Sequence, residues 1–535
     1  MQQLPSRKTE SAARRSRSRP VPRLRLSATP LPIRSEASSP LRLSTARAYA
    51  LAIATGGVLT LAFPAPDIAP LAWITIAPLL VLAGRTPVRR SLGLGLAFGA
   101  AFFGLLLVWI SIIGWVAWTV LVVVEAAFVA VFAAGWAIAS RHESPAVRVV
   151  LAAALWVALE YLRSMAPVGG FTWGELAQSQ HNLSWMLRPA SLGGGWAVAL
   201  LVMAVNALLA EAWTARATVR RGLVFCGLAA GLIALPFLLP GNSASGRPVR
   251  VAIVQGNVPR NFGGSVYDEE LHIIESHRRL TERLAPKHPG LVVWPESAVG
   301  ADPRHNPAAR RAIARAARAV GSPMIVGANL DTSSSRYKVV ALDVSSRGAI
   351  VDVYQKTHLV PFGEYVPARK WLGWIPLLDQ IPTDAIAGRA PTLFRMAGGV
   401  VAPVVSFEGD FGSLVRQRVA LGGRLVVVAT NTSTWGRSWA SAQHVASSQV
   451  RAAENGVWVV HASLSGISAF IAPDGRVVGA IPLWTRASMV ETIRFARSVT
   501  FYSRTGDWLP VGCVGLSIIG LAAAWRRRAY RPARA

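Results

Sequence analysis

The chain has very few cysteines and few acidic residues. Of its 535 residues, only two are cysteines and 27 are aspartate or glutamate, against 56 lysines and arginines. Both cysteines, Cys226 and Cys513, lie within long apolar runs, which excludes a disulfide framework in the polar part of the chain. Charged residues make up 16% and hydrophobic residues 52%, a composition too apolar for an ordinary soluble enzyme. The sequence therefore indicates a membrane protein.

The sequence also offers little for binding a metal or a nucleic acid. The histidines of the polar part, among them His358, His444 and His461, form no close pair with ligand spacing, and no cysteine is near enough to join them. The net charge of +29 would attract nucleic acid, but arginine and lysine gather at the chain ends and in short links between apolar runs. Because that distribution is typical of membrane topology, we expect no cofactor, no metal and no nucleic-acid partner.

Several apolar runs have about the length needed to cross a hydrocarbon core. We predict spans at 47–64, 68–84, 91–111, 115–139, 147–163, 191–213, 222–240 and 508–525. If the arginine-rich start of the chain is cytoplasmic, strict alternation places each basic link on that side and leaves the links with little positive charge outside. The sequence thus predicts an α-helical membrane bundle of about eight spans, with the large polar segment on the extracytoplasmic side.

These features divide the chain into predicted domains. Residues 1–46 are rich in arginine, serine and proline and poor in aromatics, so we expect a disordered basic cytoplasmic tail. We prefer an uncleaved anchor after this tail to a cleaved signal peptide, because no short small-residue cleavage site follows. The other predicted parts are a seven-span domain at 47–240, a polar catalytic domain at 249–500, a C-terminal span at 508–525 and a basic cytoplasmic tail at 526–535.

The polar domain alternates between strand-like and helical patterns. Short runs rich in valine and isoleucine indicate strands. Apolar residues recur at helical spacing at 266–286, 304–320, 411–423 and 441–456. This alternation predicts a layered α/β sandwich.

Apolar runs of this domain finish on residues able to do acyl-transfer chemistry. LVVWPE ends at Glu296, IVDVYQK ends at Lys356, and VAPVVSFE carries Ser406 and Glu408. Ligands of an α/β sheet bind in the crevice beyond the strand ends, so we expect these side chains to share one site. A helix predicted just after Ser406 would direct its first amide groups at an oxyanion there.

Taken in order, these motifs resemble the apolipoprotein N-acyltransferases, which carry membrane spans on both sides of a nitrilase-like (carbon–nitrogen hydrolase) domain. The resemblance rests on VAIVQGNVPR, VVWPES, NTSTW, QHVASSQVRAAENG and the highly specific YQKTHLVPFGEYVP. It implies an αββα sandwich in a multi-pass protein of a bacterial plasma membrane. It also implies acyl transfer from a phospholipid to the N-terminal amine of the diacylglyceryl-cysteine of a lipoprotein, through an acyl-enzyme.

The resemblance also implies roles for single residues. The family uses a Glu–Lys–Cys triad, which this chain matches at Glu296 and Lys356, while Ser406 stands where the family has cysteine. Glu296 is then the general base, Ser406 the nucleophile and Lys356 the group that stabilises the negative oxygen. Glu364 and Glu408 match acidic positions of the motif and are expected to support Lys356. A hydroxyl is harder to ionise than a thiol, so we expect slow turnover.

The serine leaves other functions open. A catalytically inactive homologue would bind lipid or stabilise a partner, and would form no acyl-enzyme. A membrane-bound amidase or esterase would release the acyl group to water without a lipoprotein acceptor.

Further segments of the sequence suggest contacts around the site. KWLGWIPLLDQIP at 370–382 places two tryptophans beside prolines, and we expect it to form a lid or to touch the membrane interface. GGFTWGELAQSQ at 169–180 resembles a family loop that faces the entrance for the acyl donor.

Overall fold

The computed structural model describes residues 43–529 apart from 85, 216–217, 260–261, 334–335, 376–377, 380 and 397. The unit that begins at Leu43 holds every element given below. Most of the basic tails predicted at 1–46 and 526–535 lies outside the described residues. The description of these tails therefore stays a prediction.

The start of the described chain, up to Leu238, and the C-terminal helix form a bundle of apolar helices. Among the described residues, six helices are long and apolar enough to cross a membrane. These are Val88–Leu106 (α3), Trp115–Ala139 (α4), Pro145–Arg163 (α5), Gly195–Thr214 (α7), Val219–Leu238 (α8, Val219–Ala234, with the 3-10 helix η4) and Trp508–Arg526 (within α15, Trp508–Ala529). The remaining predicted spans, 47–64 and 68–84, are helical but shorter: α1 covers Thr45–Thr60, and η1 with α2 covers Ala69–Ala83.

Two ion pairs join helices inside the bundle. Arg163 of α5 lies 2.8 Å from Glu125 of α4, and Arg148 of α5 pairs with Glu211 of α7. Because an unpaired charge in a membrane is costly, these pairs fix how the three helices face one another. Arg163 also donates to the carbonyl oxygens of Phe171 and Trp173, so it anchors the loop that follows α5.

The polar segment folds as an α/β/β/α sandwich, which confirms the predicted fold class. One sheet has the strand order β13-β1-β2-β3-β4-β5, with β6 paired to β4, and the other has the order β12-β11-β10-β9-β8-β7. The first sheet contains β1 (Pro248–Gln255), β2 (Leu291–Val299), β3 (Met324–Ser333), β4 (Arg336–Val344), β5 (Ile350–Gln355), β6 (Asp384–Ala385) and β13 (Ala487–Arg494). The second contains β7 (Phe394–Met396), β8 (Gly399–Val405), β9 (Leu425–Thr430), β10 (Val459–Ser463), β11 (Ser468–Ile471) and β12 (Val477–Ile481).

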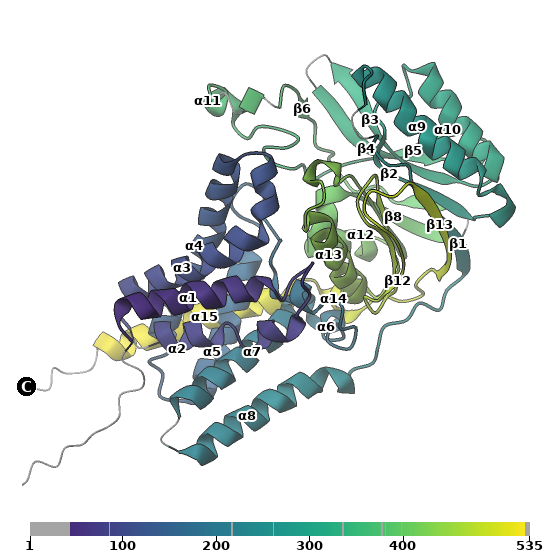
Figure 1. Cartoon of the computed structure of the whole chain (residues 1–535). Helices are drawn as coiled ribbons and strands as arrows, with labels where there is room; N and C mark the ends of the chain where they lie inside the picture. The colour runs from purple at the N-terminus through teal and green to yellow at the C-terminus, as the bar shows by residue number, and fades with distance from the viewer. Residues whose placement is uncertain are drawn as a thin grey trace, which may run out of the picture. The chain divides into compact units, whose positions relative to one another are not determined.

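Helices cover the outer face of each sheet (Figure 1). The first sheet carries α9 (Val266–Glu282) and α10 (Pro307–Val320), and the second carries α12 (Gly412–Ala420) and α13 (Ala440–Asn455). Successive strand residues face opposite layers. Ile253 and Val427 lie in the core between the sheets, whereas Val254 packs with Ile313 of α10 in one outer core and Val428 lies in the other.

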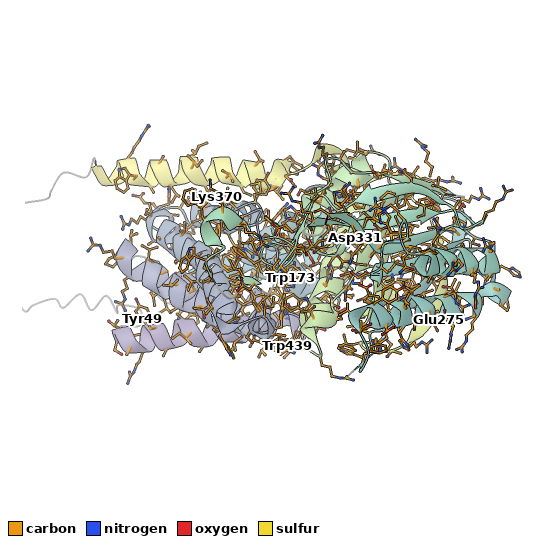
Figure 2. The ribbon with its side chains drawn as sticks, turned by 90° about the horizontal axis from the view of Figure 1, so that it is seen from above. Tyr49, Trp173, Glu275, Asp331, Lys370 and Trp439 are labelled. Atoms are coloured by element: carbon orange, nitrogen blue, oxygen red, sulfur yellow. The ribbon has the colours of Figure 1, made fainter. Side chains whose placement is uncertain are left out.

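Helix α13 lies between the second sheet and the membrane bundle. Its buried Gln443 accepts a hydrogen bond from Trp109 Nε1 (3.0 Å) and donates to the carbonyl oxygen of Leu106 (3.1 Å). Figure 2 shows Trp173 where the bundle meets the sandwich and Glu275 toward the far end of the sandwich. The bundle therefore supports the sheet whose β8 leads to Ser406.

The pairing of β2 with β3 is interrupted around Glu296. The two strands pair at Trp294 with Val326 and resume only at Val299 with Ala328. We predicted that the strand ends at Glu296, whereas it continues beyond an irregular segment to Val299. The interruption turns this part of β2 out of the regular ladder.

A glycine on the neighbouring strand leaves room for this segment. A Cβ atom at Gly327 would lie 2.1 Å from the carbonyl oxygen of Pro295 and 2.6 Å from Cα of Glu296. Backbone atoms cannot yield to such a contact as a flexible side chain can. Gly327 is therefore required for the position of Glu296.

We expect Gly327→Ala to lower the free energy of unfolding by about 1–3 kcal/mol, because the added methyl group overpacks backbone atoms. Thermal unfolding of the purified protein in detergent measures this change. Gly263→Ala is the control, since a Cβ atom there meets nothing within 4 Å. Equal unfolding midpoints for the two variants would contradict the prediction.

Candidate active site

A buried lysine is central to the site. Lys356 directly follows β5, and only 1% of its side chain is exposed. Its Nζ lies 2.6 Å from Oε1 of Glu364 and 3.4 Å from Oε1 of Glu296. Burial disfavours the positive charge, but Glu364 and Glu296 outweigh this effect and raise the pKa of Lys356, which therefore stays protonated.

Glu296 links the lysine to a hydroxyl group. Its Oε2 accepts a hydrogen bond from the backbone amide of Asn431 (2.9 Å), and the Ser406 hydroxyl donates to the same carboxylate. Burial raises the pKa of Glu296, the charge of Lys356 opposes the rise, and the charge of Glu364 adds to it. A carboxylate that has a raised pKa and already accepts a hydrogen bond from a hydroxyl group is suited to act as a general base.

Ser406 lies at a sharp turn between strand and helix. It follows β8 and has a φ of 49°, in the left-handed region that side chains other than glycine rarely adopt. Strained turns of this kind expose the side chain at the end of a sheet. The helix predicted at 411–423 is α12 (Gly412–Ala420), and a 3-10 helix, η7 (Ser406–Asp410), lies between it and β8. The amide groups nearest to Ser406 therefore belong to η7.

Glu408 joins the two strand ends that carry Lys356 and Ser406. Its carboxylate accepts hydrogen bonds from the backbone amides of Thr357 (2.8 Å), His358 (3.1 Å) and Val405 (2.9 Å). Further donors are the side chains of Tyr354, Thr357 and Arg418. Burial raises the pKa of Glu408, but Arg418 and the other donors outweigh burial and lower it below its usual range.

The structure thus brings Glu296, Lys356, Ser406 and Glu364 into one buried cluster. Glu408 bonds to the backbone after Lys356 rather than to the ammonium group, and its negative charge also helps to raise the pKa of Lys356. Sequence reasoning gave no role to Asn431, although it lies in the NTSTW motif used for the resemblance. Its contribution is a backbone amide, which no residue type signals.

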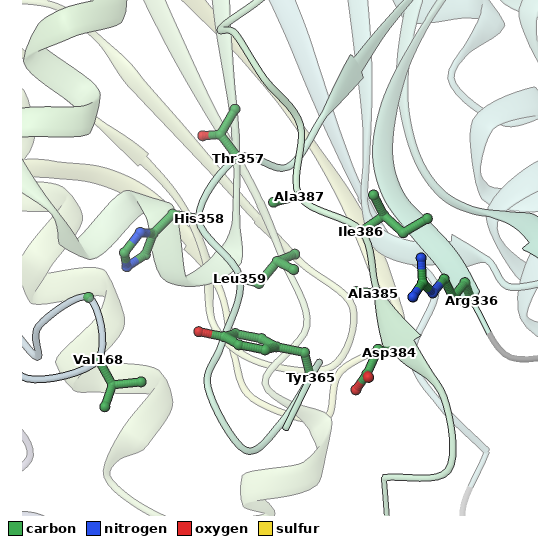
Figure 3. A pocket seen from close by; sticks show the side chains of 11 residues that line it. Val168, Arg336, Thr357, His358, Leu359, Tyr365, Asp384, Ala385, Ile386 and Ala387 are labelled. Carbon is green, nitrogen blue, oxygen red and sulfur yellow. The ribbon is translucent and has the colours of Figure 1, made fainter. Parts of the chain in front are cut away.

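A pocket of about 610 Å³ opens beside the residues that follow Lys356 (Figure 3). Figure 3 shows Val168 on one side, Arg336 and Asp384 on the other, and Tyr365 between them. The remaining lining residues are Gly169, Thr357, His358, Leu359, Ala385, Ile386 and Ala387. Because Val168 and Gly169 follow α5, the pocket is lined from both the bundle and the sandwich.

The loop at 169–180, which resembles a family loop at the entrance for the acyl donor, lies against the sandwich next to Ser406. The Trp173 ring stacks on Phe407, with centroids 5.8 Å apart. Glu175 pairs with Arg451 of α13 at 3.1 Å. This loop therefore covers the turn that holds Ser406 from the side of the bundle.

The residue types around the site limit what it could bind. Among the described residues, no group of three or more His, Cys, Asp or Glu side chains is placed to hold a metal ion. Cys226 and Cys513 are free thiols on α8 and α15 of the bundle. The site is thus a cluster of carboxylates, a lysine and a hydroxyl.

Comparison with known proteins finds matches for both parts of the chain. Residues 55–208 match the family of the apolipoprotein N-acyltransferase N-terminal domain, and residues 250–501 match the carbon-nitrogen hydrolase family. An apolipoprotein N-acyltransferase of Geobacter metallireducens is 32% identical over 504 residues, which cover 90% of this chain and 96% of the relative. One of Gloeobacter violaceus is 30% identical and covers 88% and 93%, respectively.

An amidase from Nesterenkonia sp. is 18% identical, covers 48% of this chain and 93% of its own, and gives a TM-score of 0.36.

We expect Glu408→Gln to cost about 3–5 kcal/mol of stability, because it leaves the buried Arg418 without its counter-charge. The folded-state pKa of Glu408 lies below its ordinary 4.5, so its stabilisation is present above that pH and is lost as pH falls through the folded pKa. The variant should lack this acid-dependent loss. Thermal unfolding of wild type and variant between pH 7 and acidic pH measures both effects.

The control for this prediction is Glu275→Gln, which alters a partly exposed ion pair on α9. Surface ion pairs contribute about 0–1 kcal/mol. A Glu408→Gln variant as stable as this control would contradict a central role for Glu408.

Proposed function

The chain belongs to the apolipoprotein N-acyltransferase family, and we propose on that premise that it transfers an acyl chain from a phospholipid to a bacterial lipoprotein. The acceptor would be the N-terminal amine of the diacylglyceryl-cysteine. The protein is a multi-pass membrane protein. One observation carries the proposed chemistry. The buried Lys356 lies between the carboxylates of Glu296 and Glu364, and Glu296 accepts a hydrogen bond from the Ser406 hydroxyl.

The first step would form an acyl-enzyme. Glu296 takes the proton of Ser406 while Oγ attacks the ester carbonyl of the phospholipid. The negative charge that develops on the carbonyl oxygen is stabilised by the ammonium group of Lys356. Collapse of this intermediate expels the lysophospholipid oxygen, which leaves with the proton from Glu296.

The second step would transfer the acyl group to the lipoprotein. The acceptor amine attacks the acyl ester on Ser406, and Glu296 accepts a proton from the amine. When the ester bond breaks, the Ser406 oxygen recovers that proton. The products are an amide on the lipoprotein and the free hydroxyl of Ser406.

Glu364 has a supporting role in both steps. Its Oε1 lies 2.6 Å from Lys356 Nζ, and its Oε2 accepts a hydrogen bond from the amide of Val360 (2.8 Å). The carboxylate is therefore fixed, and it keeps Lys356 charged while Glu296 is free to take up and release a proton.

A serine nucleophile has a cost in rate. The resemblance implies a cysteine at position 406, and a thiolate forms more readily than an alkoxide. A thioester also reacts faster with amines than an oxygen ester does. We therefore propose slow turnover for this chain and faster turnover for a cysteine variant.

We propose an orientation of the protein from the charges of the links between its spans. Basic links between the spans favour the cytoplasmic side, which would place the sandwich on the extracytoplasmic face of a bacterial plasma membrane. The lipoprotein acceptor and the outer-leaflet phospholipid would meet there.

A segment near the pocket is suited to contact the membrane. Trp371 and Trp374 are 74% and 79% exposed, which is unusual for the largest aromatic side chain. Figure 1 shows α11 (Arg369–Leu372) beyond the sheets, on the side of the bundle. We propose that this segment dips into the interface and admits lipid; residues 376, 377 and 380 of the predicted lid lie outside the described residues.

Acyl transfer to a synthetic diacylated lipopeptide tests the function. The purified protein is incubated with phospholipid, and N-acylation is followed by mass spectrometry. We expect wild type to acylate the peptide slowly, Ser406→Ala to be inactive and Ser406→Cys to be faster. Glu296→Gln should lose roughly 10²–10⁴-fold, because it lacks the base.

Ser413→Ala of α12 serves as the control and should retain activity. Release of free fatty acid without acylated peptide would instead indicate an amidase or esterase. A silent wild type beside an active Ser406→Cys variant would identify a disarmed homologue.

Replacement of both Trp371 and Trp374 by serine tests the membrane contact. We expect a several-fold rise in the KM for phospholipid presented in liposomes with little change in kcat, because access rather than chemistry is impaired. Leu421→Ser, at a side chain that is 58% exposed, is the matched control. An unchanged KM in the double variant would argue against a lipid-admitting segment.

A further inference from the structure

Buried polar groups beyond the proposed catalytic residues lead away from Ser406. The hydroxyl oxygen of Thr430, at the end of β9, lies 3.2 Å from Ser406 Oγ. The same oxygen lies 3.3 Å from Nδ1 of His444 on α13. Nε2 of His444 in turn lies 3.3 Å from Oδ2 of Asp410 in η7. The mechanism above uses none of these three residues.

The single proton of each hydroxyl fixes the direction of these contacts. Ser406 donates its proton to Glu296, so it can only accept from Thr430. Thr430 then has no proton left for His444, so Nδ1 of His444 must carry a hydrogen and donate to Thr430.

This tautomer leaves the other ring nitrogen of His444 without a hydrogen. With the proton on Nδ1, Nε2 of His444 is a bare acceptor and cannot face an ionised carboxylate without cost. Oδ2 of Asp410 lies 3.3 Å from this nitrogen, but neither atom makes a hydrogen bond, so the contact places a buried carboxyl group beside the imidazole and adds no link to the hydrogen bonds. Asp410 is fully buried, and burial raises its pKa well above the usual value.

The surroundings agree with a neutral chain of groups. Burial lowers the pKa of His444 to about 4, so its ring is neutral at pH 7. The ring packs against His461, with centroids 4.8 Å apart, and against Trp173. Thr430, His444 and Asp410 are each at most 2% exposed, so water does not compete for their hydrogen bonds.

We propose that His444 and Thr430 are positioning residues that form a one-way chain of hydrogen bonds and keep the Ser406 hydroxyl donating to Glu296. The proposal rests on the proposed function in that it takes Ser406 as the nucleophile. These hydrogen bonds fix the rotation of the Ser406 hydroxyl. Without them, the hydroxyl could point its proton at Thr430 and its lone pair at Glu296.

The chain of hydrogen bonds also favours oxygen over sulfur as the nucleophile. When Ser406 loses its proton to Glu296, the Thr430 hydroxyl donates to a developing alkoxide, and such charge-assisted bonds are stronger than neutral ones. Sulfur is a weak acceptor and gains little from the same donor. This support offsets part of the difficulty of ionising a serine. No net proton passes along the chain, so the balance of both transfer steps is unchanged.

Removal of the Thr430 hydroxyl in two backgrounds tests the proposal. Thr430→Val keeps the shape of the side chain but lacks the donor, and Thr430→Ser restores it. We measure acyl transfer to the lipopeptide and, independently, the rate at which a fluorophosphonate probe modifies Ser406 in the full chain. Thr430→Val should slow both by roughly 10-fold or more, as expected for a hydrogen bond to a charged group. Thr430→Ser should recover most of the rate.

The Ser406→Cys background separates positioning from folding. There, Thr430→Val should change acyl transfer and alkylation by iodoacetamide by less than about 3-fold, because the thiol does not depend on the donor. An equal loss in both backgrounds would assign Thr430 a merely structural role and overturn the proposal. Absence of an effect in the serine background would overturn it as well.

The probe also separates this inference from the proposed function. Probe labelling that depends on Thr430, in a protein that acylates no peptide, would support the chain of hydrogen bonds and reject the acyltransferase function. Acyl transfer that does not depend on Thr430 would support the function and reject the chain. A wild type that neither labels nor transfers would reject both.

Discussion

The carboxylate of Glu408 holds together the two sheets at the end where the site lies. It accepts hydrogen bonds from the backbone after Lys356, which follows the first sheet, and from Val405, the last residue of β8 in the second. A second hydrogen bond also joins the two sheets: the amide of Asn431, which follows β9 of the second sheet, donates to Glu296 in β2 of the first. Because the lysine and the serine come from different sheets, the geometry of the whole cluster depends on these ties.

The membrane bundle supports the site as well as anchoring it. Trp173 stacks on Phe407 beside the turn of Ser406, and Gln443 of α13 bonds to residues of the bundle. Such contacts keep water from the buried cluster, where the low dielectric strengthens the attraction between Lys356 and its carboxylates. A pocket lined by both parts of the chain suits a reaction in which a lipid donor meets a protein acceptor.

Sequence patterns predicted the α/β sandwich and the apolar bundle because burial imposes a period on each element. They also brought together Glu296 and Lys356, since both end apolar runs. They could not predict the shortening of the spans at 47–64 and 68–84, where α1 ends at Thr60 and α2 begins only at Ala77, with Pro78 in its first turn. The contact of Thr430 with His444 depends on the packing of α13 against a sheet, which no local pattern reveals.

The central claim is that the acyl group passes through the oxygen of Ser406. The most direct measurement is to incubate the protein with phospholipid in the absence of an acceptor, digest it and search for acylated peptides by mass spectrometry. The account predicts an acyl ester on Ser406 that withstands neutral hydroxylamine, is cleaved by alkali and disappears when the lipopeptide is added. Acylated lipopeptide formed without any acyl group on Ser406 would contradict it.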